Sequence, residues 1–482
     1  MVSEKKMIQI IQSGIEKSSY PKRILIVGAG MSGLVAASLL NHAGHNVQII
    51  EASTRVGGRV FTKRAPFTEG LYLDVGAMRI PNSHRLVMEY VKKFNLPLQP
   101  FINSSPHDIL YLNGIKTTYG QYLRNPDILN YPVSPSEKGK NVNQLITKMV
   151  EPIFRFVSQN PKKHWPIVIE YFEKFSVDDY LRSNPYGLFL SNAAIELIKI
   201  MHMIEGFPEF SLVEVLREMS LLFNDDVHFY EIKGGNDLLP NAFLSELYPN
   251  IHFNRQVVKI HQTQHDVTIS CIHPQTKSLY HYTGDIAIIT IPFSTLQFVQ
   301  MEPYDSVSHE KRKAIRELHY VTSAKIGLQF SQRFWEKEGM YGGRVITDLP
   351  TRFSYFPSHD FDSEGHGVML ASYTWEDDAL PWESLTEDEQ IRKALDTLSI
   401  IYDQSISDHF VIGISHNWGK YPYSSGCFTL YKPWQETELS PHIASPEGRM
   451  YFAGEHTDVP HGWIQTAIKS GIRVALEVNH LP

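Results

Sequence analysis

The chain has 482 residues and a net charge of −7 at pH 7, with 42% hydrophobic and 20% charged residues. This length requires two or three domains, and the composition is that of an ordinary globular protein. The acidic balance, without a cluster of Lys and Arg, excludes nucleic acid as the main partner, because neutralising phosphates requires clustered cations.

The cysteine content and the terminal segments favour a cytoplasmic protein. Only Cys271 and Cys427 occur, which is too few for a disulfide framework and fits a reducing compartment. The first residues lack the apolar core of a signal peptide, and no apolar run is long enough to span a membrane. We therefore expect no membrane contact. The histidines are scattered and form no metal-binding cluster with cysteine, so no metal is expected.

The best-defined local pattern is a strand, a glycine-rich turn, a helix and a second strand. Residues 23–27 are predicted to form a short buried strand and residues 34–42 a helix. Residues 46–50 read as the next strand, which ends at Glu51. This order is typical of a dinucleotide-binding unit with a parallel sheet.

Within this unit, the glycines fit the G-x-G-x-x-G pattern and each has a physical role. Gly28 would form the tight turn, Gly30 would let the backbone approach a pyrophosphate, and Gly33 would allow close packing of helix on strand. The helix N-terminus supports negative charge. Glu51 can accept hydrogen bonds from ribose hydroxyls and would repel a 2′-phosphate.

Two segments far apart in the sequence resemble the flavin-containing amine oxidase family. They are "EASTRVGGRV" (51–60) and "MYFAGEHTDVPHGWIQTAIKSG" (450–471). The resemblance implies FAD, with Arg59 near its phosphates, Glu455 on its ribityl chain and the amides of residues 462–467 facing the flavin. It also gives the full set of expected cofactor-binding residues: Gly28, Gly30, Met31, Ser32, Gly33, Glu51, Ala52, Arg59, Gly76, Ala77, Met78, Arg79, Val257, Cys427, Glu455, Gly462, Trp463, Ile464, Gln465, Thr466 and Ala467.

The same resemblance sets the expected fold class and domain organisation. We expect an α/β protein with a Rossmann-type FAD-binding domain, a mixed-sheet substrate domain and a helical insertion. The FAD-binding domain would be discontinuous, over residues 20–102, 225–300 and 411–482. Residues 103–224 have a helical, aromatic pattern and would form the insertion, and residues 301–410 would form the substrate domain.

A lone arginine in the stretch "VGAMRIP" (75–81) points to an anionic ligand. A guanidinium that is partly withdrawn from water needs a partner. "GAMRIP" resembles the L-amino-acid oxidase branch of the family, which implies that Arg79 holds the substrate α-carboxylate and that Tyr373 shares it. Bidentate geometry suits a carboxylate. The alternatives are an Arg79 paired with an internal acid such as Asp74 and a Tyr373 that only packs in a strand.

Two further residues match catalytic positions of the family. Lys325 in "SAKIGLQF" matches a lysine that holds a water near the flavin, and Trp463 matches an aromatic residue beside the substrate. A lysine in an apolar strand is costly unless it has a role. The plainer interpretations are a lysine that reaches solvent at a strand end and a tryptophan that packs in the core.

The acidic pair Asp225-Asp226 marks a departure from this branch. Animal amino-acid oxidases carry a histidine shortly before that pair, whereas this chain has Asn224, which we expect to line the substrate site. Asn cannot take a proton at neutral pH. His228 lies nearby in the sequence and is a weaker candidate for the missing base.

The stretch "YPYSSGCFTLY" (421–431) is a second departure, because it resembles the monoamine oxidase branch. There the matching cysteine is bonded covalently to FAD, so Cys427 is a candidate for a thioether. Phe428 would take the place of an aromatic residue at the substrate. The alternative is a small cysteine that merely packs.

The resemblance as a whole implies an FAD-dependent oxidase of apolar or aromatic L-amino acids. Arg79, Tyr373, Lys325 and Trp463 are the expected catalytic set. The products would be 2-oxo acid, ammonia and hydrogen peroxide, with O2 as the oxidant, and a homodimer is the expectation from the family. The rivals are a monoamine or polyamine oxidase, a decarboxylating amino-acid monooxygenase, and a flavin-folded scaffold that binds a partner without turnover.

Overall fold

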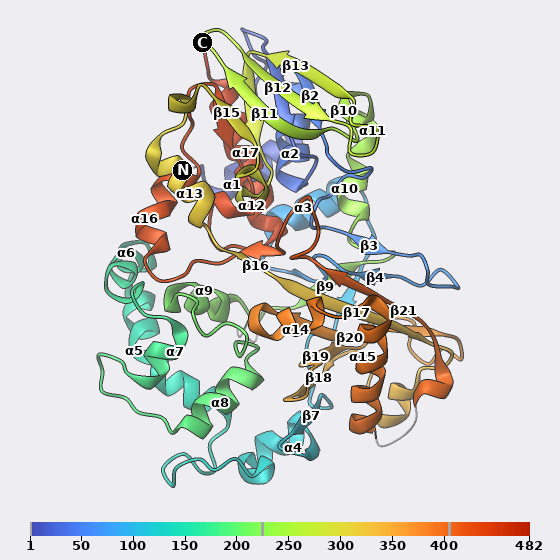
Figure 1. Ribbon diagram of the computed structural model, residues 1–482. Coiled ribbons are helices and arrows are strands. Elements are labelled where there is room, and N and C mark those ends of the chain that lie inside the picture. Colours follow the sequence, from blue (N-terminus) through green and yellow to red (C-terminus); the bar gives the residue numbers. More distant parts are fainter. Residues whose placement is uncertain (1, 223–225, 403–405) are drawn as a thin grey trace.

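A five-stranded parallel sheet forms the upper part of the molecule in Figure 1. The computed structural model describes residues 2–222, 226–402 and 406–482. The strand order is β10-β2-β1-β14-β23, and all neighbouring strands are parallel. The strands are β1 (Arg23–Val27), β2 (Asn46–Ile50), β10 (Ile251–His252), β14 (Ile286–Ile289) and β23 (Met450–Phe452). Strand β23 pairs with β14, which pairs with β1, so the last part of the chain joins the same sheet as the first.

The two faces of this sheet are covered by different layers, because side chains alternate along each strand. Ile24 and Ile26 pack against the helices α1 (Glu4–Ser13), α2 (Met31–His42), α3 (Arg85–Lys93) and α17 (Ile464–Asn479). Leu25 and Val27 pack on the opposite face. That face is covered by the sheet β13-β12-β11-β15 and by α12 (Phe293–Leu296), α13 (His309–Glu317) and α16 (Gln435–Ile443). The strands of this second layer are β11 (Gln256–Gln262), β12 (Val267–Ile272), β13 (Leu279–Gly284) and β15 (Gln300–Glu302).

A seven-stranded mixed sheet forms the second body of the molecule, at the lower right of Figure 1. Its order is β21-β17-β20-β19-β18-β7-β8, and only the pair β18–β7 is parallel. The strands are β7 (Ile109–Leu112), β8 (Ile115–Thr118), β17 (Ser323–Phe330), β18 (Arg344–Thr347), β19 (Phe353–Tyr355), β20 (Gly367–Trp375) and β21 (Phe410–Asn417). One face packs on α14 (Leu380–Glu383) and α15 (Glu387–Tyr402).

The other face of the mixed sheet is covered by a group of helices, at the lower left of Figure 1. Leu370 and Ile346 on that face share a core with these helices. They are α5 (Val142–Gln159), α6 (Pro161–Phe172), α7 (Val177–Arg182), α8 (Asn192–Met201) and α9 (Leu212–Leu222), with α4 (Tyr119–Arg124) below them. The helices therefore form a wall over the sheet that carries Tyr373.

Short elements connect these bodies. The three-stranded sheet has the order β5-β9-β6, and two-stranded ladders join β3 to β4 and β16 to β22. Their bounds, with those of two short helices, are β3 (Thr62–Lys63), β4 (Leu73–Asp74), β5 (Ile80–Pro81), β6 (Leu98–Phe101), β9 (Phe229–Ile232), β16 (Tyr320–Val321), β22 (Phe428–Thr429), α10 (Leu238–Ala242) and α11 (Leu244–Leu247).

The parallel sheet and the mixed sheet confirm the predicted α/β architecture. The predicted bounds of β1 and β2 are correct, but α2 begins earlier than expected, at Met31, because Gly30 already caps it. Strands β10 and β11 are separated by a break at Asn254, whose φ is 56°. This left-handed backbone conformation interrupts a strand.

The mixed sheet extends beyond the range that the sequence indicated for it. Strands β7 and β8 lie in the stretch read as helical, and β21 continues past residue 410. The domain boundaries themselves stay predictions. Among the residues that the structure describes, no helix is both long and apolar enough to cross a membrane.

Candidate active site

The turn between β1 and α2 contains one glycine that borders open space, Gly30, and one that is tightly packed against backbone, Gly33. A Cβ on Gly33 would lie 2.2 Å from the carbonyl oxygen of Gly28, so only glycine fits there. A Cβ on Gly30 would meet nothing within 4 Å, and Gly30 lines the main cavity. The first residues of α2, Met31 and Ser32, also line this cavity. The N-terminal amides of a helix are thus exposed to a space in which a pyrophosphate fits.

Glu51 is fixed beside this turn by hydrogen bonds to the backbone. Its Oε2 accepts the Ala29 N–H at 2.7 Å, and its Oε1 accepts the N–H and hydroxyl of Ser53 at 2.8 and 2.7 Å. The carboxylate is largely buried but borders the cavity. Since each carboxylate oxygen can accept more than one hydrogen bond, Glu51 retains the capacity to bind ribose hydroxyls.

The main cavity has a volume of about 940 Å³ and is lined by segments from both ends of the chain. It contains nearly all the residues expected at the cofactor: Gly28, Gly30, Met31, Ser32, Glu51, Ala52, Arg59, Gly76, Ala77, Met78, Arg79, Val257, Cys427, Glu455, Gly462, Trp463, Ile464 and Ala467. The expected substrate residues Tyr373 and Phe428 line the same cavity. Cofactor and substrate would thus share one continuous space.

Three of the expected cofactor residues lie behind the cavity wall. Gly33 serves the packing described above. The Gln465 side chain accepts the N–H groups of Leu86 and Val87 at 3.0 and 3.2 Å, which satisfies free amides in the first turn of α3. The Thr466 hydroxyl donates to the Pro460 carbonyl. The side chains of Gln465 and Thr466 therefore hold the wall in place and do not face the cavity.

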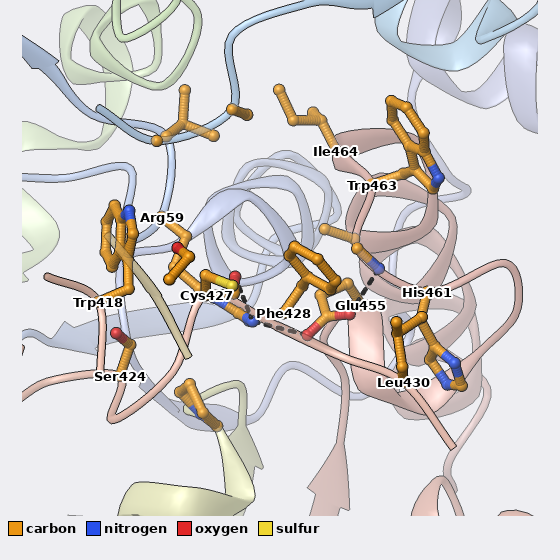
Figure 2. Close-up of a pocket in the computed structure, with 18 of the residues that line it drawn as sticks. Arg59, Trp418, Ser424, Cys427, Phe428, Leu430, Glu455, His461, Trp463 and Ile464 are labelled. Carbon is orange, nitrogen blue, oxygen red and sulfur yellow. Dashed lines mark hydrogen bonds and ion pairs between the residues drawn. The ribbon is translucent and has the colours of Figure 1, made fainter. Parts of the chain in front are cut away.

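A buried ion pair joins the two cofactor segments. Arg59 donates from Nη1 to Glu455 Oε1 at 2.6 Å, and Glu455 Oε2 accepts the Gly462 N–H at 2.8 Å (Figure 2). Burial alone would raise the pKa of Glu455, but Arg59 and His461 outweigh it, so the pKa is lowered. The carboxylate is therefore charged, and it fixes the loop before α17 to the segment after β2.

Lys325 is fully buried and does not reach solvent, which excludes the strand-end interpretation. Its Nζ donates to the carbonyl oxygens of Gly76 at 2.7 Å and Asp74 at 3.1 Å. Burial lowers its pKa to about 7. The ammonium lies directly behind the cavity wall formed by Gly76 and Ala77, and it is not itself among the lining residues.

Arg79 faces the cavity and its hydrogen-bond partners are neutral. Nη1 donates to the side-chain oxygen of Asn103 and to the Tyr355 hydroxyl at 3.4 Å. Asp74, the alternative partner, instead accepts hydrogen bonds from Thr62 and from the backbone of Asn236. In the described part of the chain, no acid lies within ion-pair distance of Arg79.

Several aromatic side chains line the cavity that Arg79 faces. Tyr373 packs against Trp375 with ring centroids 4.0 Å apart, and the Lys325 ammonium lies 4.4 Å from the Tyr373 ring centre. Phe428 contacts the backbone at Gly462, and Trp463 stands at the start of α17 (Figure 2). Tyr373 and Trp375 lie on β20 of the mixed sheet, Phe428 lies on β22, and Trp463 precedes α17.

The family model for flavin containing amine oxidoreductases matches residues 31–479. The chain belongs to this family. It is 52% identical over 476 residues to YobN of Bacillus subtilis (strain 168), covering 99% of this chain and 98% of that protein. It is 37% identical to the L-amino-acid oxidase of Siganus canaliculatus, over 98% of this chain and 88% of that protein.

The fold of this flavin amine oxidase also matches solved structures of the family. Cyclohexylamine oxidase from Brevibacterium oxydans IH-35A superposes with a TM-score of 0.75 at 16% identity, over 95% of this chain and 99% of that chain. Family membership implies FAD. The open Gly30 turn, the helix terminus and the cavity of about 940 Å³ fit that cofactor.

The amine oxidase site also contains residues that sequence reasoning missed. Glu218 on α9 and His84 before α3 line the cavity, and both contact Trp463. His461 lines it as well, and its Nδ1 lies 2.6 Å from Glu214 Oε2. Glu214 and Glu218 belong to the helical stretch that carries no motif, so only the packing of α9 over the cavity reveals them.

Two other predicted positions lie elsewhere. His228 is exposed and does not line the cavity, so the structure gives no support to it as the missing base. Asn224, expected at the substrate, lies outside the described residues.

The two glycines of the turn provide a matched pair of variants. Gly30→Ala should leave the thermal stability of the apoprotein unchanged but weaken FAD binding by roughly tenfold or more, since the new methyl group enters the cofactor space. Gly33→Ala should lower the free energy of unfolding by about 1–3 kcal/mol or more, because its methyl group meets backbone. Thermal unfolding and FAD titration distinguish the two, and unchanged FAD affinity in Gly30→Ala would contradict this assignment.

Proposed function

We propose that the chain is an FAD-dependent L-amino-acid oxidase that converts apolar or aromatic amino acids to 2-oxo acids, ammonia and hydrogen peroxide. The observation that carries this proposal is the Arg79 guanidinium, which faces the cavity with only neutral hydrogen-bond partners among the described residues. A simple amine offers this cation nothing to bind, whereas an amino acid offers a carboxylate.

Arg79 and Tyr373 are proposed to hold the substrate carboxylate. Both line the cavity, and the planar guanidinium can donate two parallel hydrogen bonds to one carboxylate. Burial raises the pKa of Tyr373, so its hydroxyl remains a donor at neutral pH. Fixing one end of the substrate orients its Cα–H bond, which supplies much of the rate in reactions of this kind.

The cavity walls favour an apolar substrate side chain. The side chains of the helical region that line the cavity are mostly apolar, and they include Ile204, Phe207, Val215 and Met219. Trp463 and Phe428 add aromatic surface from the cofactor side. Burial of apolar side chains against such walls is favourable.

The buried Lys325 has a proposed role in positioning. By donating to the carbonyls of Asp74 and Gly76, it holds the backbone segment that leads to Arg79. Bound FAD would supply the redox chemistry, namely hydride acceptance and electron transfer to O2. The protein contributes placement and electrostatics to that chemistry.

Replacing Arg79 by alanine tests the carboxylate assignment. Arg79→Ala should lower kcat/KM for L-phenylalanine by roughly 100-fold or more. The reason is that each of the two charge-assisted hydrogen bonds to the carboxylate contributes about 1.5–3 kcal/mol. FAD content and thermal stability should not change. Arg85→Ala, at an exposed arginine outside the cavity, is the matched control. Peroxide release from L-phenylalanine and from 2-phenylethylamine measures the effect, and preferred turnover of the amine by the unmodified protein would favour a monoamine oxidase.

We expect FAD to be held without a covalent bond. The Cys427 Sγ donates to the Val321 carbonyl at 3.1 Å, and burial raises the pKa of the thiol to about 12. The thiolate required for thioether chemistry is therefore scarce at neutral pH. Acid precipitation should give a colourless pellet and a yellow supernatant. A yellow pellet that becomes colourless in Cys427→Ala would instead establish a thioether.

Two further features of the proposal stay predictions. The homodimer rests on the family resemblance, and the cytoplasmic location rests on the cysteine content and the terminal segments of the sequence. A decarboxylating reaction would be distinguished by mass analysis, because it converts the amino acid to an amide instead of a 2-oxo acid.

A further inference from the structure

Glu218 is an acidic side chain inside the cavity that the carboxylate-binding scheme does not use. It lies on α9 and lines the cavity beside Trp463, whose Nε1 donates to Glu218 Oε1 at 3.1 Å. In the described part of the chain, this is the one hydrogen bond of the Glu218 side chain, and the carboxylate forms no ion pair. The carboxylate therefore has unused acceptor capacity next to the aromatic residue expected at the substrate.

The charge distribution around Glu218 complements an amino-acid zwitterion. Arg79 is close enough to Glu218 to affect its titration, although the two form no ion pair. A carboxylate bound at Arg79 would carry the α-ammonium only a few bonds away. The cavity thus offers a cation for one end of the zwitterion and an anion for the other.

The amino group must lose a proton before oxidation. An ammonium has no lone pair with which to expel a hydride, so the proton has to move to an acceptor. We propose that the Glu218 carboxylate accepts this proton: R–NH3⁺ and Glu218–COO⁻ become R–NH2 and Glu218–COOH. The nitrogen keeps the electron pair of the broken N–H bond, and the proton stays on the Glu218 oxygen until solvent removes it. This inference rests on the proposed function.

The surroundings of Glu218 bring the pKa of its carboxyl group close to neutral pH. Burial raises its pKa to about 7 and Glu214 adds to the rise, while the Trp463 hydrogen bond, His461 and Arg79 act in the opposite direction. A base that titrates near the working pH transfers protons efficiently. The carboxylate form is present above the pKa and is lost as the pH falls through about 7.

The neighbouring histidines are less suited to this role. Burial lowers the pKa of His84 to about 4, so it is a weak base, and its ring is packed edge-on against Trp463. His461 is committed to Glu214. Burial alone would lower the pKa of His461, but the Glu214 carboxylate has the larger effect and the pKa is raised. The protonated ring is therefore favoured, and it cannot accept a further proton.

Glu218→Gln tests the inference, because glutamine can still accept the Trp463 hydrogen bond but cannot take a proton. The readout is the rate at which L-phenylalanine bleaches the flavin under anaerobic conditions, measured against pH. At neutral pH the rate should fall by roughly 100-fold or more, as expected for the loss of a general base. At alkaline pH, where the free amino acid is already deprotonated, the variant should approach the unmodified protein.

The controls separate this role from a structural one. Glu218→Asp should keep a titrating limb in the profile, and Glu209→Gln, at an exposed acid, should match the unmodified protein. Benzoate binding, followed by the flavin spectrum, should be at least as tight in Glu218→Gln as in the unmodified protein, because the substitution removes a negative charge from the cavity. A rate lost equally at every pH, or an unchanged profile, would overturn the inference. Failure of the unmodified protein to oxidise any amino acid would instead overturn the proposed function.

Discussion

The site depends on one electrostatic constraint, a guanidinium that faces the cavity and has no acidic partner among the residues that the structure describes. Arg79 follows the wall segment Gly76–Ala77–Met78, and its partners Asn103 and Tyr355 are neutral. A cation in such surroundings is incompletely compensated, and an incoming anion gains the interaction that the fold leaves open. The buried Lys325 donates to the carbonyls of Asp74 and Gly76 and so helps to fix the backbone that leads to Arg79.

The cavity itself exists because the two ends of the chain meet. Strand β23 pairs with β14, which pairs with β1, and this places the loop before α17 beside the segment after β2. The Arg59–Glu455 pair then closes the contact. Removing one member would leave the other charge buried and unpaired, which is far costlier than losing a surface ion pair. The ion pair thus joins two distant segments of the chain at the cavity.

The sequence predicted the parts of the site that depend on local backbone chemistry. The roles of Gly30 and Gly33 follow from their spacing in the glycine-rich turn. The bounds of β1 and β2 follow from the hydrophobic pattern of the sequence alone. Glu218 could not be found in this way, because its position over the cavity results from the packing of α9 against distant segments. The strands β7 and β8 were missed for a related reason, because β7 takes its parallel partner β18 from a distant part of the chain.

A crystal structure of the FAD-bound protein with the unreactive ligand 2-aminobenzoate is the most direct test of the central claim. The account predicts both carboxylate oxygens within hydrogen-bond distance of the Arg79 guanidinium, with the Tyr373 hydroxyl beside them. An Arg79 paired with Asp74 or Glu218, with the ligand carboxylate bound elsewhere, would contradict it.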